Sequence, residues 1–143
     1  MRTEKDFLGE IQIPNRLYYG IQTTRAMHNF NITGYELDRD FIIALGIVKA
    51  AAARANLRTG RMPAQIGAAI IKAAEEVGEG QWQDQFVVDC IQGGAGTSMN
   101  MNANEVIANR ALEILGSKKG NYDLVSPNNH VDMAQSANDV IPT

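Results

Sequence analysis

The chain is best understood from Gly93-Gly-Ala-Gly-Thr-Ser-Met-Asn-Met-Asn-Ala-Asn-Glu-Val-Ile-Ala-Asn-Arg110. Gly93, Gly94 and Gly96 allow a backbone with positive φ, whose N–H groups no side chain covers. Thr97 and Ser98 follow where such a turn would enter a helix. A glycine turn, two hydroxyls and a helix N-terminus together favour the binding of an anion.

A helix is expected to follow this turn. Asn100, Asn102 or Asn104 could cap it, because a short amide side chain accepts hydrogen bonds from free first-turn N–H groups. Gly116 is a suitable end for the helix. Apolar residues recur at helical spacing between these limits: Val106, Ile107, Ala111, Leu112, Ile114 and Leu115.

Two nucleotide-binding motifs are excluded by the residues of the stretch. A dinucleotide fingerprint needs a third glycine where Met99 stands, and a P-loop needs a lysine, which is absent between Lys72 and Lys118. A carboxylate is the better candidate ligand, because hydroxyls, amides and N–H groups are enough to hold it. The alternative is that the glycines only form a tight connection and the asparagines only cap a helix.

A second polar, turn-forming cluster runs from Ser126 to Asp139, with the sequence Ser-Pro-Asn-Asn-His-Val-Asp-Met-Ala-Gln-Ser-Ala-Asn-Asp. Together, the two clusters resemble two of the three signature regions of the aspartase/fumarase superfamily. The segments 6–10 (Asp-Phe-Leu-Gly-Glu) and 19–30 (Tyr-Gly-Ile-Gln-Thr-Thr-Arg-Ala-Met-His-Asn-Phe) resemble the N-terminal part of that family. The likeness covers nearly the whole chain.

This resemblance implies a reaction and a set of binding residues. Family members add or remove a small molecule across a carbon–carbon double bond, typically at a fumarate, and surrounding donors stabilise the aci-carboxylate that forms. The implied substrate-binding residues are Thr97, which matches the carboxylate-binding threonine, with Ser98 and Asn100 beside it, and Ser136, Ala137 and Asn138. Ala137 departs from the family, which usually has Ser or Thr there, so only its backbone N–H remains as a donor.

Two residues favour the aspartase members over the fumarases. Ala95 replaces a serine, and Ser126 stands where fumarases carry a histidine of a secondary anion site. The implied reaction is the reversible deamination of L-aspartate to fumarate and ammonia. Fumarate hydration is the second reading. The third is a non-catalytic helical module that binds anions or is structural, since the superfamily includes lens proteins.

The third signature region, a Gly-Ser-Ser loop that carries the catalytic serine in this family, does not occur in the sequence. We therefore expect residues 1–143 to form an N-terminal domain without the central helix bundle and the C-terminal domain. Such a domain would contribute no catalytic residue of its own and be inactive alone. The family also implies a homotetramer of the full-length protein.

The expected fold class is mainly α with a short extended N-terminal segment. Asp38 is a suitable N-cap for a long helix over residues 39–58, in which Gly46 and several alanines would let another helix approach closely. A second amphipathic helix is expected between Pro63 and Gly78. Pro14 interrupts an extended piece, and residues 23–30 could form one or two helical turns.

Composition limits the possible partners. With 13 basic and 16 acidic residues the net charge is −3, which does not favour nucleic acid. No apolar run is long enough for a membrane span, and the polar N-terminus does not resemble a signal peptide, so we expect a cytoplasmic protein. His28 and His130 lack second ligands at metal spacing, and we expect no metal, no cofactor and a small dicarboxylate or amino-acid substrate. Cys90 is interpreted as a small buried apolar residue.

Overall fold

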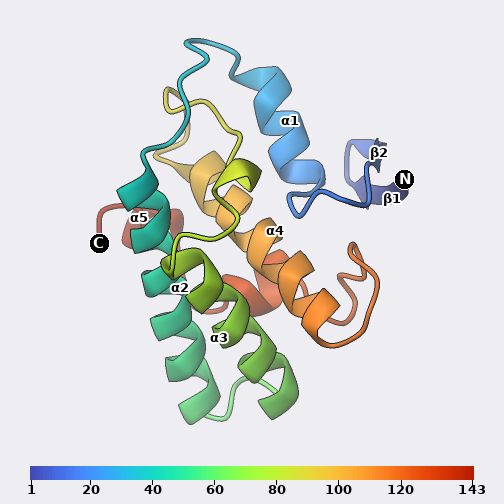
Figure 1. Cartoon of the computed structure of the whole chain (residues 1–143), viewed down its shortest axis with the longest axis vertical. Coiled ribbons are helices and arrows are strands. Elements are labelled where there is room, and N and C mark those ends of the chain that lie inside the picture. The colour runs from blue at the N-terminus through green and yellow to red at the C-terminus, as the bar shows by residue number, and fades with distance from the viewer.

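Helix α4 (Thr97–Ile114) runs through the middle of the molecule in this computed structural model, which describes residues 1–143 (Figure 1). Every residue from Asn102 to Asn109 is buried, so the helix has no solvent face over two turns. Helix α3 (Ala64–Gly78) packs on one side of α4 and α1 (Ile21–Asn29) on another. The mainly α fold expected from the sequence is confirmed.

Helices α2 (Arg39–Arg58) and α3 form a close pair. Asp38 caps α2 as expected, since its carboxylate accepts from the N–H of Asp40. A Cβ atom on Gly46 would lie 2.4 Å from the backbone nitrogen of Gly78, so only glycine permits this approach of the two backbones. The expected close contact through small residues is confirmed.

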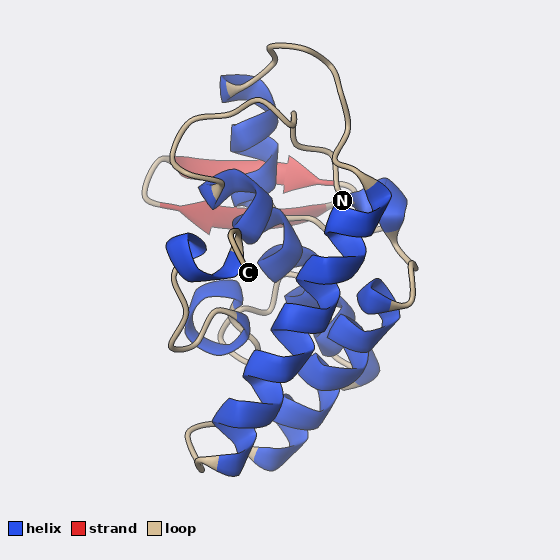
Figure 2. Cartoon of the chain, turned by 90° about the vertical axis from the view of Figure 1, so that its left-hand side faces the viewer, coloured by secondary structure: helices blue, strands red, loops and turns tan.

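A β-hairpin forms the N-terminal part of the chain. Strands β1 (Arg2–Asp6) and β2 (Gly9–Ile13) pair antiparallel, with Arg2 opposite Ile13. In Figure 2 the two strands lie in the upper half of the molecule, and the loop that joins α2 and α3 lies at the bottom. The extended segment expected here is therefore one strand of a hairpin, and its first strand was not foreseen because its residues are mostly polar.

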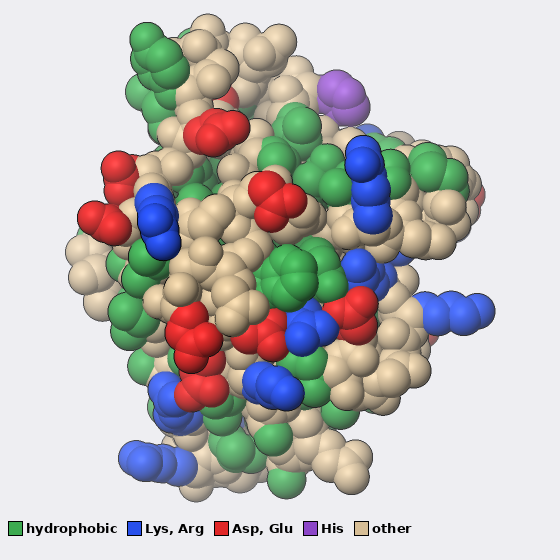
Figure 3. Space-filling model, viewed as in Figure 1, with side chains coloured by type: hydrophobic (Ala, Val, Ile, Leu, Met, Phe, Trp, Pro, Cys, Tyr) green, Lys and Arg blue, Asp and Glu red, His purple; other side chains and the backbone are tan.

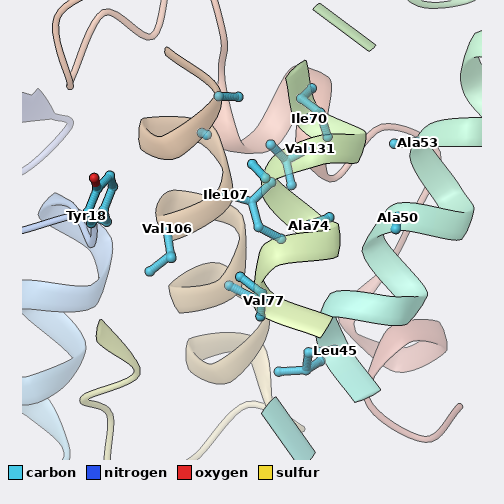
Figure 4. Close-up of a cluster of buried hydrophobic side chains, with 14 of the residues drawn as sticks. Tyr18, Leu45, Ala50, Ala53, Ile70, Ala74, Val77, Val106, Ile107 and Val131 are labelled. Atoms are coloured by element: carbon cyan, nitrogen blue, oxygen red, sulfur yellow. The ribbon is translucent and has the colours of Figure 1, made fainter. Parts of the chain in front are cut away.

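One apolar core joins these elements (Figure 4). Ile70 of α3, Ile107 of α4 and Val131 are each at most 1% exposed, and their side chains lie close together. Val131 ends the π-helical turn Pro127–Val131, which precedes the short helix α5 (Ala137–Val140). The second polar cluster is thus anchored in the core by an apolar side chain.

The face shown in Figure 3 carries interspersed basic and acidic side chains without a large patch of one sign. None of the helices combines the length and the apolar character needed to cross a membrane. A 3-10 turn at Gln83–Gln85 leads toward the glycine-rich stretch, with Phe86 and Val88 buried on the way.

Candidate functional site

The glycine turn takes the left-handed conformation that its sequence predicts. Gly94, Ala95 and Gly96 have φ values of 80°, 53° and 84°. Gly96 is the N-cap, so α4 begins at Thr97. The expectation that Asn100, Asn102 or Asn104 caps this helix is wrong, because these residues lie inside it and are all buried. The amides of Asn100 and Asn102 bond to other segments instead of the first turn, and that of Asn104 has no hydrogen-bond partner.

Thr97 and Ser98 occupy the first turn of α4. Thr97 is exposed, and its hydroxyl donates to the carbonyl of Gly94 at 2.5 Å. The N–H groups of Thr97, Met99 and Asn100 have intramolecular acceptors, whereas that of Ser98 has none. The N-terminus of α4 therefore presents a free N–H group and two hydroxyls at the positive end of an 18-residue helix.

Ser136 is the N-cap of helix α5, and Ala137 and Asn138 are its first two residues. The Ser136 hydroxyl accepts from the N–H of Asn138 at 3.2 Å. Ser136 and Asn138 are exposed and Ala137 is half-buried. Their polar groups are accessible to solvent, in contrast to Asn100, of which only 3% is exposed.

The structure brings the two polar clusters together at two points. A Cβ atom on Gly96 would lie 2.7 Å from Cγ1 of Ile141, just after α5. One turn into α4, the Asn100 amide donates to Oδ1 of Asp132 at 3.2 Å. The glycine turn and the segment before Ser136 are therefore direct neighbours, although more than 30 residues separate Asn100 from Asp132 in the sequence.

Sequence reasoning missed Lys49, whose side chain is completely buried. Its Nζ donates to Asp132 Oδ1 at 2.7 Å and to Gln135 Oε1 at 3.0 Å. Burial lowers the pKa of Lys49, and the hydrogen bond to Asp132 opposes this shift. The signal was available, because Lys49 lies at helical spacing from the buried residues Leu45 and Ala53.

A hollow of about 460 Å³ lies between the hairpin, α1, α4 and the start of the π-helical turn. Its polar lining comprises Lys5, Asp6, Gln22, Glu105, Tyr122, Ser126 and Asn128. The Glu105 carboxylate accepts from the N–H groups of Gly20, Gln22 and Thr23 at 2.8–3.0 Å. Burial raises the pKa of Glu105 to about 7, although these N–H groups oppose the shift.

His130 and Arg25 have structural partners. His130 Nδ1 accepts from the N–H of Ser126 at 2.9 Å, and burial lowers the pKa of its imidazole. Arg25 forms a two-pronged ion pair with Asp6 at 2.6 and 2.7 Å. Cys90 is half-buried, and no group of three or more His, Cys, Asp or Glu side chains lies close enough to hold a metal ion.

Comparison with known proteins gives a consistent family. The sequence profile of a lyase family matches residues 9–143. An aspartate ammonia-lyase of Bacillus subtilis is 65% identical over 99% of this chain, and one of a Bacillus species is 62% identical over all of it. A class II fumarate hydratase of Halobacterium salinarum is 55% identical over 99% of the chain.

Solved structures agree with the sequence comparison. The crystal structure of a fumarate lyase:delta crystallin from Brucella melitensis superposes with a TM-score of 0.96 at 51% identity, covering 99% of this chain and 32% of that one. The chain spans 30% and 31% of the length of the two Bacillus relatives. By sequence profile, by identity over its whole length and by fold, the chain belongs to the aspartase/fumarase superfamily of lyases, in which it matches the N-terminal domain.

Proposed function

We propose that this chain forms the substrate-carboxylate-binding part of an enzyme that reversibly deaminates L-aspartate to fumarate and ammonia. The observation that carries the proposal is the first turn of α4, where the Ser98 N–H is free and the Thr97 and Ser98 hydroxyls lie beside it. Ser136, Ala137 and Asn138 supply further donors from the neighbouring segment. The Asn100 amide links the two clusters through its hydrogen bond to Asp132.

The proposed chemistry follows from the charge that such a site stabilises. Removal of a proton next to a carboxylate places a second negative charge on that carboxylate, and fixed donors lower the energy of this state more than that of the substrate. Uncharged donors at the positive end of α4 suit this task. In this proposal the base is a serine supplied from outside residues 1–143, so this domain binds and orients but is inactive alone.

Two alternatives remain distinct candidates. Fumarate hydration is supported by the 55% identity to a class II fumarate hydratase. A non-catalytic role is suggested by the delta crystallin in the name of the Brucella structure. Aspartate deamination is preferred because the two Bacillus relatives, at 62% and 65% identity, are aspartate ammonia-lyases.

The experiment that tests the proposal follows fumarate by its ultraviolet absorbance, using the complete gene product with L-aspartate and L-malate in parallel. Fumarate from aspartate alone is the expected result. Fumarate from malate would establish the hydratase instead, and turnover of neither substrate would contradict both enzyme readings.

Thr97→Ala tests the assignment of the carboxylate-binding residues. In this proposal the Thr97 hydroxyl exchanges its bond to the Gly94 carbonyl for one to the substrate carboxylate. Loss of one such donor raises the barrier by about 3–4 kcal/mol, so kcat should fall by roughly 100- to 1,000-fold. Thr59→Ala is the matched control, because the Thr59 hydroxyl also donates to a carbonyl three residues earlier, at the far end of α2. Wild-type turnover by Thr97→Ala, or an equal loss in the control, would refute the role of Thr97.

We further propose that residues 1–143 act as one domain of a cytoplasmic homotetramer. Thr97, Ser136 and Asn138 are exposed, which suits a site completed by other parts of the assembly. Sedimentation of the complete gene product should give four times the mass of one subunit, and a monomeric active enzyme would contradict this arrangement.

A further inference from the structure

The segment just before the proposed substrate-binding residues has little regular structure of its own. Ala134 takes φ of 58°, a left-handed conformation that is unfavourable for a residue with a Cβ atom. Helix α5 has only four residues. Something outside this segment must therefore fix where Ser136, Ala137 and Asn138 lie.

Helix α2 supplies the fixed point. Lys49 is 0% exposed and bonds both Asp132 and Gln135, on the two sides of Ala134. Two turns along the same face, the Asn56 amide donates to the carbonyl of Met133 at 2.9 Å. Gln135 then donates to the carbonyls of Val131 and Met133 at 2.9 and 3.2 Å, which closes the loop upon itself.

Asp132 connects this anchor to the first polar cluster. Its Oδ1 accepts from Lys49 of α2 and from Asn100 of α4, at 2.7 and 3.2 Å. A completely buried ammonium is costly unless a carboxylate and further acceptors compensate it, so the arrangement of these partners is tightly constrained. The ion pair consequently sets the distance between the first turn of α4 and the start of α5.

We infer that the Lys49–Asp132 ion pair is a positioning device that holds the Ser136–Asn138 segment in register with Thr97 and Ser98. Lys49 forms no hydrogen bond with any of these residues and acts through Asp132 and Gln135. The inference rests on the proposed function, since it assigns the ion pair a role in aligning two sets of substrate donors.

The test uses Lys49→Met and Asp132→Asn in the complete gene product, with Glu76→Gln as the matched control. Glu76 also pairs with a cation of another helix, since both its oxygens bond Arg110, but it lies away from the second cluster. A misplacement of about 1 Å costs roughly 100-fold in rate, so kcat/KM should fall by about that factor in the first two variants. The control should stay within about two-fold.

The double variant Lys49→Met/Asp132→Asn separates positioning from charge balance. It leaves no buried charge unpaired, so its melting temperature should recover relative to the single variants. The anchor on Gln135 is still missing, and kcat/KM should stay about 100-fold low with KM raised. Recovery of both melting temperature and kcat/KM would overturn the inference.

A readout independent of turnover keeps the inference separate from the proposed activity. In Lys49→Met, the amides of Asp139, Val140 and Ile141, which bond within α5, should exchange hydrogen at least about ten-fold faster than in the wild type. The amides of the β-hairpin should be unaffected. Unchanged exchange in α5 of Lys49→Met would overturn the inference even if the wild type turns over aspartate. Faster exchange in Lys49→Met, together with a wild type that does not turn over aspartate, would refute only the proposed reaction.

Discussion

Two buried asparagines of helix α4, Asn109 and Asn104, differ in their hydrogen bonding. Toward its C-terminal end, the Asn109 side chain donates to the Tyr18 carbonyl at 2.7 Å and accepts from the Gly120 N–H at 2.7 Å. Toward its N-terminal end, Asn104 is equally buried, yet neither its amide nitrogen nor its oxygen has a hydrogen-bond partner. Asn100 is intermediate, with its oxygen unpartnered.

This contrast separates an asparagine that stabilises the fold from one whose burial is uncompensated by hydrogen bonds. Buried polar groups are nearly always paired, and exceptions concentrate where function competes with stability. The paired half of α4 holds the N-terminal loops and the α4–π-turn loop in place. The unpaired amide atoms of Asn100 and Asn104 lie in the half of α4 that begins at the glycine turn, where Asn102 is fully paired. The glycine turn and the second cluster each also carry an alanine of positive φ, Ala95 and Ala134.

The largest expected effect compares Asn109→Leu with Asn104→Leu. Both side chains are 0% exposed, and both substitutions replace the same amide group with the same apolar group. Asn109→Leu leaves the Tyr18 carbonyl and the Gly120 N–H unpaired and should reduce the free energy of unfolding by about 3–5 kcal/mol. Asn104→Leu removes two unpaired atoms and should change it by less than about 1 kcal/mol. Urea denaturation measures both, and equal losses would abolish the distinction between the two asparagines.

Glu105, at the junction of the two halves, should give the fold a pH dependence. Its pKa rises from 4.5 to about 7 on folding because burial disfavours the charged form. The folded state thus binds this proton more tightly, so its contribution is fully present below about pH 4.5 and is lost as pH rises to about 7, on the order of 3 kcal/mol in total.

Denaturation of the wild type and of Glu105→Gln across this range tests the sign. Glutamine does not titrate, so the stability of the wild type relative to the variant should decline as pH rises. A difference that grows with pH would mean that the N–H groups of Gly20, Gln22 and Thr23 outweigh burial.

Gly96→Ala probes the contact between the two polar clusters. Its φ of 84° and the nearby Ile141 side chain should together cost about 2 kcal/mol of stability. Gly116→Ala is the control, since its φ is 73° but nothing lies within 4 Å of the added carbon, and it should cost only about 1 kcal/mol. Equal melting temperatures for the two variants would argue against a tight contact at Ile141.

The smallest expected effect is a gain. Ala95→Gly and Ala134→Gly relieve positive φ values of 53° and 58°, and each should stabilise by about 0.5 kcal/mol after the entropy of the unfolded chain is counted. Ala44→Gly, in the interior of α2, should destabilise by about 1 kcal/mol. Calorimetry can resolve the opposite signs, and a loss in all three variants would show that the two turns are not strained.

The regular helices could be predicted because their signals are local. Asp38 and the apolar spacing located α2, and Gly116 marked the end of α4. The start of α4 was misjudged, since capping preference cannot reveal that Asn102 is needed for Gln85 and Val87, well before it in the chain. The role of Glu4 also depends on a residue distant in the sequence and was not predicted. Its carboxylate accepts from the N–H of Ile21 at the start of α1.

The candidate site was partly predictable. The donors Thr97, Ser98, Ser136 and Asn138 stand in recognisable turns, and the structure places the two turns side by side. Their assignment to substrate remains a prediction. Lys49 was missed because a lysine among alanines is normally a solvent-facing residue, and its partner Asp132 lies 83 residues away.

The exposure pattern of α4 also bears on how this protein could evolve. Thr97 faces solvent, whereas every residue from Asn102 to Asn109 is enclosed. Substitutions at the exposed tip of the helix change the surface without disturbing the packed interior, whereas substitutions between Asn102 and Asn109 disturb the core and reduce stability. A lineage carrying this helix can therefore change its exposed tip by single substitutions while the buried part of the scaffold stays the same. Under the proposed function, these are the substitutions that would change the small molecule bound.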